Sequence, residues 1–232
     1  LRSLTPGWTN WASESFMDRV AYSGGAEPLA FCQGLLTAGG KNAGSAPNAV
    51  GGAKLMSNVL ARTAEKAGRG TALPQGQGLG IACTFGQERA MPTWTACVAE
   101  MSVDADSGVV TLNKLTIVID AGSIVHPNGA LTQTEGAALC GASLALHEGT
   151  AFVDGQAKDT NLGGYRHMRD VPQLDIELVA SDEQPLCLGE PATTVVGPAI
   201  GNAIFAATGA RVRHLPIRPD AVKQAISETE MA

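Results

Sequence analysis

The sequence predicts an α+β protein in which helices are mixed with an interrupted β-sheet. Apolar residues recur at helical spacing from Lys54 to Lys66, alternate as in a strand from Cys97 to Val103, and form a second apolar strand over 109–119. Helices and strands mixed along one chain pack as layers around a shared core. The 232 residues are enough for one large or two small domains.

The first part of the chain, residues 1–70, is interpreted as a helical segment. The expected helices span residues 13–21, 27–36 and 54–66. Ser13 is a good N-cap, Pro28 lies in the first turn of the second helix, and Gly68 ends the third. Residues 38–52 are rich in glycine, alanine, asparagine and serine, which predicts a loop.

The second part, residues 71–232, is interpreted as an α+β portion. After a glycine-, proline- and glutamine-rich connection over 70–80, the expected elements are a β-hairpin (97–103 and 109–119), a helix over 133–146, a turn at 152–156, a strand over 174–180, a helix over 198–209 and an edge strand over 212–217. Small residues dominate the helix over 133–146, so it should pack closely against a neighbour.

Composition and charge exclude several classes of function. A net charge of −6 argues against nucleic-acid binding, which needs a clustered basic surface. No apolar run is long enough to span a bilayer. The 5 cysteines include no closely spaced pair, and the 4 histidines lack metal-ligand spacing. We therefore expect no metal ligands and no iron–sulfur ligands in this chain.

The most informative local pattern is Glu190, a single carboxylate between Gly189 and Pro191 at the start of an apolar helix-like stretch. Glycine lets another group approach the backbone closely, and proline fixes φ and removes a donor. One interpretation is structural, because a carboxylate at a helix N-terminus complements the helix dipole by roughly 0.3–1 kcal/mol. The other is functional, because a charge among apolar neighbours is costly unless it has a partner or a task.

Five segments in the same chain order resemble the molybdenum hydroxylases, the xanthine oxidase and aldehyde oxidoreductase family. The Gly-Glu-Pro run at 189–191, followed by small apolar residues that end in Ala-Thr-Gly at 207–209, resembles the C-terminal signature of that family. The other segments are Arg2-Ser3 with Glu14-Ser-Phe-Met-Asp18, Asp120 to Pro127, Gln133-Thr-Glu-Gly136 and Asn161 to Arg166. The overall pattern is most similar to the large subunit of the isoquinoline 1-oxidoreductase type and related bacterial aldehyde dehydrogenases.

The resemblance implies the C-terminal portion of a molybdenum-cofactor-binding large subunit, whose family members are several times longer. It implies hydroxylation of aldehydes or N-heteroaromatic compounds, with water as the oxygen source and molybdopterin cytosine dinucleotide as the cofactor. The implied partners are the remainder of the molybdopterin-binding subunit, a small subunit with 2Fe-2S clusters and a cytochrome c subunit. This subgroup favours the periplasmic face over the cytoplasm.

The resemblance also assigns roles to individual residues. Glu190 would be the general base, Gln133 would contact the pyranopterin, Gly189 would allow close approach of the cofactor, and Arg2 would orient substrate or cover the molybdenum pocket. The alternatives are a helix cap for Gln133 and a surface or interface arginine for Arg2. Asp120 is expected to accept backbone hydrogen bonds in its turn. The rival interpretation of the whole chain is a non-catalytic scaffold or assembly subunit, in which Glu190 is a buried cap.

The sequence departs from the family pattern in two ways. Leu188 and Ala192 stand where smaller residues are usual in the family motif, so the pocket beside Glu190 should be narrower than in other family members. The family's phenylalanine-containing glycine loop and its Gly-Gln-Gly segment have no convincing match. We therefore expect this chain to form part of the cofactor wall but not to hold the cofactor alone.

Overall fold

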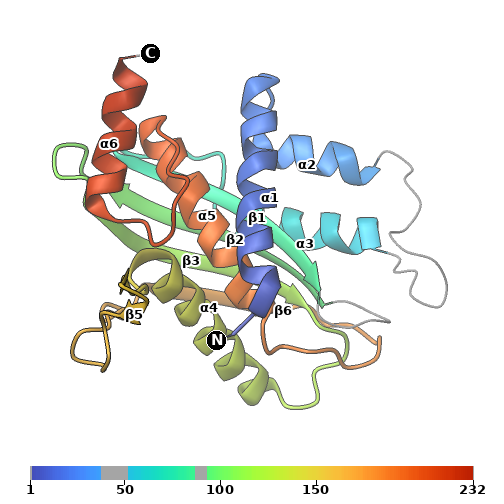
Figure 1. Ribbon diagram of the computed structural model, residues 1–232. Coiled ribbons are helices and arrows are strands. Elements are labelled where there is room, and N and C mark those ends of the chain that lie inside the picture. The colour runs from blue at the N-terminus through green and yellow to red at the C-terminus, as the bar shows by residue number, and fades with distance from the viewer. Residues whose placement is uncertain (1, 38–51, 87–92, 232) are drawn as a thin grey trace.

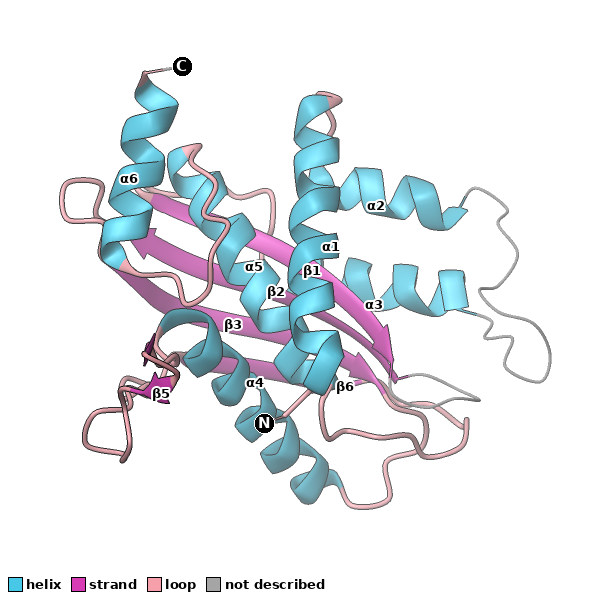
Figure 2. Ribbon diagram, viewed as in Figure 1, coloured by secondary structure: helices cyan, strands magenta, loops and turns pink. Residues whose placement is uncertain are grey.

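The structure is a computed structural model, and it describes residues 2–37, 52–86 and 93–231. Its helices are α1 (Leu4–Ser23), α2 (Pro28–Thr37), α3 (Gly52–Lys66), α4 (Pro127–Leu146), α5 (Pro191–Thr208) and α6 (Pro219–Glu230). Its strands are β1 (Gln77–Gly86), β2 (Thr93–Val103), β3 (Val110–Asp120), β4 (Phe152–Val153), β5 (Gln156–Ala157) and β6 (Gln173–Leu178). The predicted α+β class is therefore confirmed (Figure 2).

A four-stranded sheet forms the centre of the molecule, in the order β1-β2-β3-β6. The first three strands pair antiparallel, and β6 pairs parallel with β3. Helices cover both faces: α4, α5 and α6 pack on one face, and α3 packs on the other with α2 beside it (Figure 1). The alternation along β2 explains this arrangement, because Cys97 and Ala99 face α5 while Ala96 and Val98 face α3.

Helix α5 lies at the centre of the larger core and touches β1 backbone to backbone. A Cβ atom added at Gly80 would lie 2.1 Å from Ala199 O and 2.1 Å from Ala203 N. One added at Gly78 would lie 2.3 Å from Ala203 O. These glycines are the reason that β1 was not predicted. Glycine usually indicates a turn, whereas here it lets a strand approach a helix closely.

Helix α1 packs across the opposite side of α5. Its Trp11 ring fills the space above Gly197 and Gly201, where an added Cβ at Gly201 would lie 2.8 Å from the indole. Farther along the same contact, Arg211 binds Asp18 at 2.5 Å, and its guanidinium stacks over the Phe205 ring, 3.5 Å from the centroid. The helix predicted over 13–21 therefore exists, but it is longer than the prediction.

Side chains from helices and loops cover the outer edge of β1. Three side chains donate to carbonyl oxygens of β1: Asn10 to Cys83 O at 3.3 Å, Arg69 to Leu79 O at 3.1 Å and Asn202 to Ile81 O at 3.1 Å. In addition, Glu14 Oε2 accepts from Cys83 N at 2.7 Å. Burial raises the pKa of Glu14 above its ordinary value, and the Cys83 N–H lowers it. Side chains, not another strand, therefore bind these four main-chain groups at the edge of the sheet.

Two other predicted elements differ from the structure, and one helix of the structure was not predicted. Helix α5 begins at Pro191, not at 198, so Pro198 lies inside it. The segment over 212–217 is not a strand; Pro216 has no backbone N–H to donate to a sheet, and β6 pairs with β3 at that side. Helix α6 was not predicted, and it buries Val222 and Ile226. The loop predicted over 38–52 lies, apart from Gly52, outside the described residues.

Asn10 compensates for the proline inside α5. Pro198 has no N–H, so it leaves the carbonyl of Thr194, four residues earlier, without its helical donor. The Asn10 amide donates to that oxygen at 3.1 Å. Position 10 therefore supplies from α1 the hydrogen bond that α5 cannot make itself.

We expect Asn10→Ala to lower the free energy of unfolding by about 1–3 kcal/mol, because a buried carbonyl loses its donor. The matched background is Pro198→Ala, which restores an N–H to α5. In the Pro198→Ala background, Asn10→Ala should lower the free energy of unfolding by a smaller amount, since only the hydrogen bond to Cys83 O is then lost without a replacement. Urea unfolding of the four proteins gives the coupling energy. An equal cost in both backgrounds would contradict the compensation.

Candidate functional site

The three polar residues predicted for the site lie at one end of the α4–α5 pair. Along the contact between the two helices, the residue numbers rise in both. Thr193 Oγ1 donates to Ala137 O at 3.0 Å, and a Cβ added at Gly141 would lie 2.5 Å from Thr193 O. Farther along, a Cβ added at Gly197 would lie 3.8 Å from Ala145 Cβ. The helices therefore run parallel. Glu190, just before this contact, lies level with Ala137 and about one turn from Gln133.

Arg2 reaches the same turn of α4 from the start of α1. A Cβ at Gly136 would lie 3.8 Å from Arg2 Nη1, and Gly136 is one turn from Gln133. Figure 1 shows the beginning of α1, close to the N-terminus, next to α4. The structure thus brings Arg2, Gln133 and Glu190, which are far apart in the sequence, to one region of the molecule.

Glu190 occupies the N-cap position of α5 but does not cap the helix. Its carboxylate is half-buried and makes no capping hydrogen bond, and it forms no ion pair within the described part of the chain. Two other helices show what capping looks like here: Glu27 accepts from Ala30 N at 2.8 Å in α2, and His126 Nδ1 accepts from Gly129 N at 2.8 Å in α4. The Glu190 carboxylate therefore keeps its acceptor capacity for another group.

Gly189 lies in open space. A Cβ added there would meet no atom within 4 Å, and its φ lies outside the left-handed region. This chain's own fold therefore does not require glycine at position 189. Within the described residues, the space beside the backbone at Gly189 is open.

Gln133 lies elsewhere in its helix than the sequence suggested. It was expected to open the helix, but α4 begins at Pro127, with Pro127 in the first turn and His126 as the cap. Gln133 lies in the second turn and is half-buried, so the free N–H groups of the helix N-terminus do not lie next to it. The Pro-Asn-Gly run at 127–129 resembles a turn, which is why the first turn was missed.

A cavity of about 310 Å³ lies between α1, α4 and α5, next to Arg2 and the first turn of α5. Apart from Arg2 and Glu148, the lining is apolar or formed by small residues. The large apolar groups in the wall are those of Trp8, Trp11, Leu144, Pro198, Leu215 and Pro216. Its size and lining suit a small, mainly apolar molecule.

The loop before Glu190 is tied to the ends of the central strands. Leu186 N donates to Ala121 O at 2.9 Å, and Ser123 N donates to Glu183 O at 2.9 Å. Asp120 Oδ1 accepts from Gly122 N at 3.2 Å, so its predicted role in the turn is confirmed. Thr93 Oγ1 donates to Cys187 O at 2.6 Å, a contact that sequence reasoning missed because a threonine at a strand start carries no distinguishing signal.

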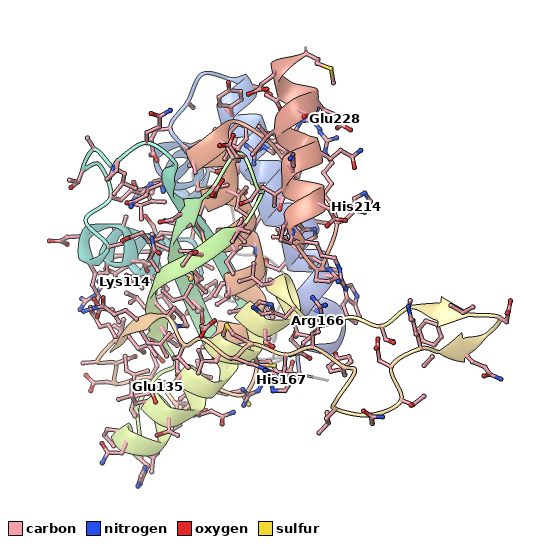
Figure 3. All side chains as sticks on the ribbon, turned by 90° about the vertical axis from the view of Figure 1, so that its left-hand side faces the viewer. Lys114, Glu135, Arg166, His167, His214 and Glu228 are labelled. Atoms are coloured by element: carbon pink, nitrogen blue, oxygen red, sulfur yellow. The ribbon has the colours of Figure 1, made fainter. Side chains whose placement is uncertain are left out.

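The segment between α4 and β6 forms a second distinct feature. Figure 3 shows the β4–β5 hairpin projecting from the body, with Arg166 and His167 on the chain that returns across α4. The turn predicted at 152–156 is confirmed as this hairpin. The Tyr165 hydroxyl donates to Glu148 Oε2 at 2.9 Å and fixes the returning chain to the end of α4.

The described residues contain neither a cluster of metal-ligating side chains nor a membrane-spanning helix. No group of three or more histidine, cysteine, aspartate or glutamate side chains is placed to hold a metal ion in residues 2–37, 52–86 and 93–231. Within the same ranges, no helix combines the length and apolar character that crossing a membrane requires.

Comparison with known proteins identifies relatives along nearly the whole chain. It is 53% identical over 222 residues to the membrane-bound aldehyde dehydrogenase (pyrroloquinoline-quinone) of Gluconacetobacter polyoxogenes, covering 94% of this chain and 29% of that protein. It is 27% identical over 221 residues to the isoquinoline 1-oxidoreductase subunit beta of Brevundimonas diminuta, covering 94% of this chain and 26% of that one. The chain thus spans less than a third of either relative.

A solved structure has the same fold. Aldehyde oxidoreductase from Desulfovibrio gigas superimposes with a TM-score of 0.76 at 17% sequence identity, covering 98% of this chain and 41% of that one. A sequence profile of the molybdopterin cofactor-binding domain matches residues 53–172, which is more than half of the chain. The chain therefore belongs to the molybdopterin cofactor-binding domain family.

Proposed function

We propose that this chain is the C-terminal portion of a molybdenum-dependent oxidoreductase and that Glu190 is its general base. In this proposal Gln133, Gly189 and Arg2 form part of the wall that holds molybdopterin cytosine dinucleotide. The remaining contacts come from the rest of the molybdopterin-binding subunit. The observation that carries the proposal is the Glu190 carboxylate, which stands at a helix start without capping it.

The residues present fit such a cofactor. A large polar group needs donors, acceptors and room, and this end of the α4–α5 pair provides all three. The Glu190 carboxylate, the Gln133 amide and the Arg2 guanidinium form no hydrogen bond or ion pair within the described residues, so their polar atoms remain available. The gap at Gly189 allows close approach to the backbone.

When bound, the molybdenum cofactor supplies two-electron redox chemistry with water as the oxygen source. Glu190 accepts a proton at its carboxylate as the oxygen nucleophile attacks the substrate, a role that general-base groups fill within hydrogen-bond reach. Arg2 presents a planar guanidinium that orients a carbonyl group. The apolar cavity between α1 and α4 excludes water from the substrate's hydrocarbon part.

Aldehydes are the substrate class that we favour over N-heteroaromatic compounds. The relative with 53% identity is named as an aldehyde dehydrogenase, whereas the isoquinoline relative is only 27% identical. The same relative is named as membrane-bound, which supports association of the assembled enzyme with a membrane. The periplasmic face is our proposed location for it. The proposed partners are a small subunit with 2Fe-2S clusters and a cytochrome c subunit.

The test is to measure the cofactor content of the purified complex that contains this chain. We expect about one molybdenum per chain and oxidation of aldehydes with an artificial electron acceptor, as for a catalytic site with a bound metal. The printed name of the Gluconacetobacter protein also includes pyrroloquinoline quinone, so quinone is quantified in the same sample. Quinone without molybdenum would overturn the proposed cofactor. Molybdenum without any oxidation of aldehydes or N-heteroaromatics would favour the scaffold.

A further inference from the structure

We infer that Thr93 is a positioning residue for Glu190. This inference rests on the proposed function, because it concerns where the base stands. Thr93 does not act on substrate itself; its hydroxyl holds the loop that ends at Glu190.

Glu190 is held through its backbone. Its carboxylate has no hydrogen bond or ion pair within the described residues, and Gly189 beside it touches nothing at its Cβ position. On the helix side, Thr193 N donates to Glu190 O at 2.8 Å. The other side is a chain segment without helix or strand that runs from β6 to α5. The position of the base therefore depends on how that segment is anchored.

Thr93 anchors that segment three residues before Glu190. Its Oγ1 donates to Cys187 O at 2.6 Å. The Thr93 residue is 0% exposed, and its backbone pairs with Gly86 in the sheet, so the donor is fixed by a rigid element. Cys187 itself is exposed, so the carbonyl end of this bond lies in a surface loop. A buried strand residue thus sets the place of an exposed loop.

The hydroxyl matters because a general base works only within hydrogen-bond reach of the proton that it takes. A displacement of about 1 Å can lower turnover by about 100-fold. Binding of substrate in the apolar cavity does not depend on Thr93, since Thr93 is not part of its wall. Loss of the Thr93 hydroxyl should therefore lower kcat far more than it raises KM.

The experiment compares Thr93→Val with Thr93→Ser in the complete complex. Valine keeps the shape without the donor, and serine keeps the donor. We expect T93V to lower kcat per bound molybdenum by about 10- to 100-fold with KM changed by less than about threefold. T93S should stay within about threefold of wild type. If T93V does not accumulate, T93C takes its place, because its thiol is only a weak donor.

Three results would overturn the inference: a normal kcat for T93V, equal losses for T93V and T93S, or a loss that disappears when activity is divided by bound molybdenum. Glu190→Gln is measured in parallel to separate this inference from the proposed function. If E190Q retains activity, the role of Glu190 fails and the inference falls with it. If E190Q is inactive while T93V is normal, only the role of Thr93 fails.

Discussion

Glu190→Gln should abolish turnover of the assembled enzyme while leaving its molybdenum content close to that of wild type. Glutamine has nearly the same shape as glutamate but cannot accept a proton, so the change removes the base and little else. General-base catalysis contributes about 10²–10⁴-fold, and we expect a loss in that range or beyond it. Because the Glu190 carboxylate caps no helix and pairs with no described residue, the fold should lose little stability.

The measurement is kcat with a saturating aldehyde, divided by bound molybdenum. Glu183→Gln is the matched control, since Glu183 is an exposed carboxylate in the same loop whose described contacts use its backbone. E183Q should behave as wild type. Activity of E190Q within about tenfold of wild type would rule out the assigned role, because a base contributes more than that.

The second large effect is expected in the core. Gly80→Ala should lower the free energy of unfolding by more than about 3 kcal/mol, or prevent folding, because the new Cβ would collide with backbone atoms. Ala199 O and Ala203 N each lie 2.1 Å from the Cβ position, and neither belongs to a flexible side chain. To remove this collision, β1 and α5 would have to move apart along their whole contact.

Gly86→Ala is the control for this prediction. It lies in the same strand, and a Cβ there meets nothing within 4 Å. We expect its free energy of unfolding to stay within about 1 kcal/mol of wild type. Urea denaturation followed by circular dichroism compares the two variants. Similar stability of G80A and G86A would show that the close approach of β1 to α5 is not needed.

Sequence patterns predicted the fold best where side chains alternate clearly. The hairpin of β2 and β3 was found because apolar residues such as Cys97 and Met101 recur with period two before the Asp104–Gly108 turn and a second apolar strand follows the turn. The same reasoning missed β1, because Gly78 and Gly80 serve a tertiary contact that no local pattern reveals. It also placed the start of α5 at Pro198, because it could not foresee that Asn10 makes an internal proline tolerable.

For the site, a local motif could identify the proposed base but not the residues that hold it in place. Glu190 stands out because a carboxylate between glycine and proline is unusual beside an apolar helix. The region where Arg2 and Gln133 join it is set by the parallel packing of α4 on α5, a property of two helices that are far apart in the sequence. Thr93 could not be predicted, since its importance depends on a single carbonyl, that of Cys187.

The covered edge of β1 restricts how the protein can assemble. Strand addition by a neighbouring polypeptide is disfavoured at that side, because Asn10, Glu14, Arg69 and Asn202 already occupy four of the main-chain groups that a new strand would use. Larger assemblies must therefore meet this side of the molecule through side chains. The same cover keeps newly made copies from joining edge to edge, which is a common route to insoluble protein.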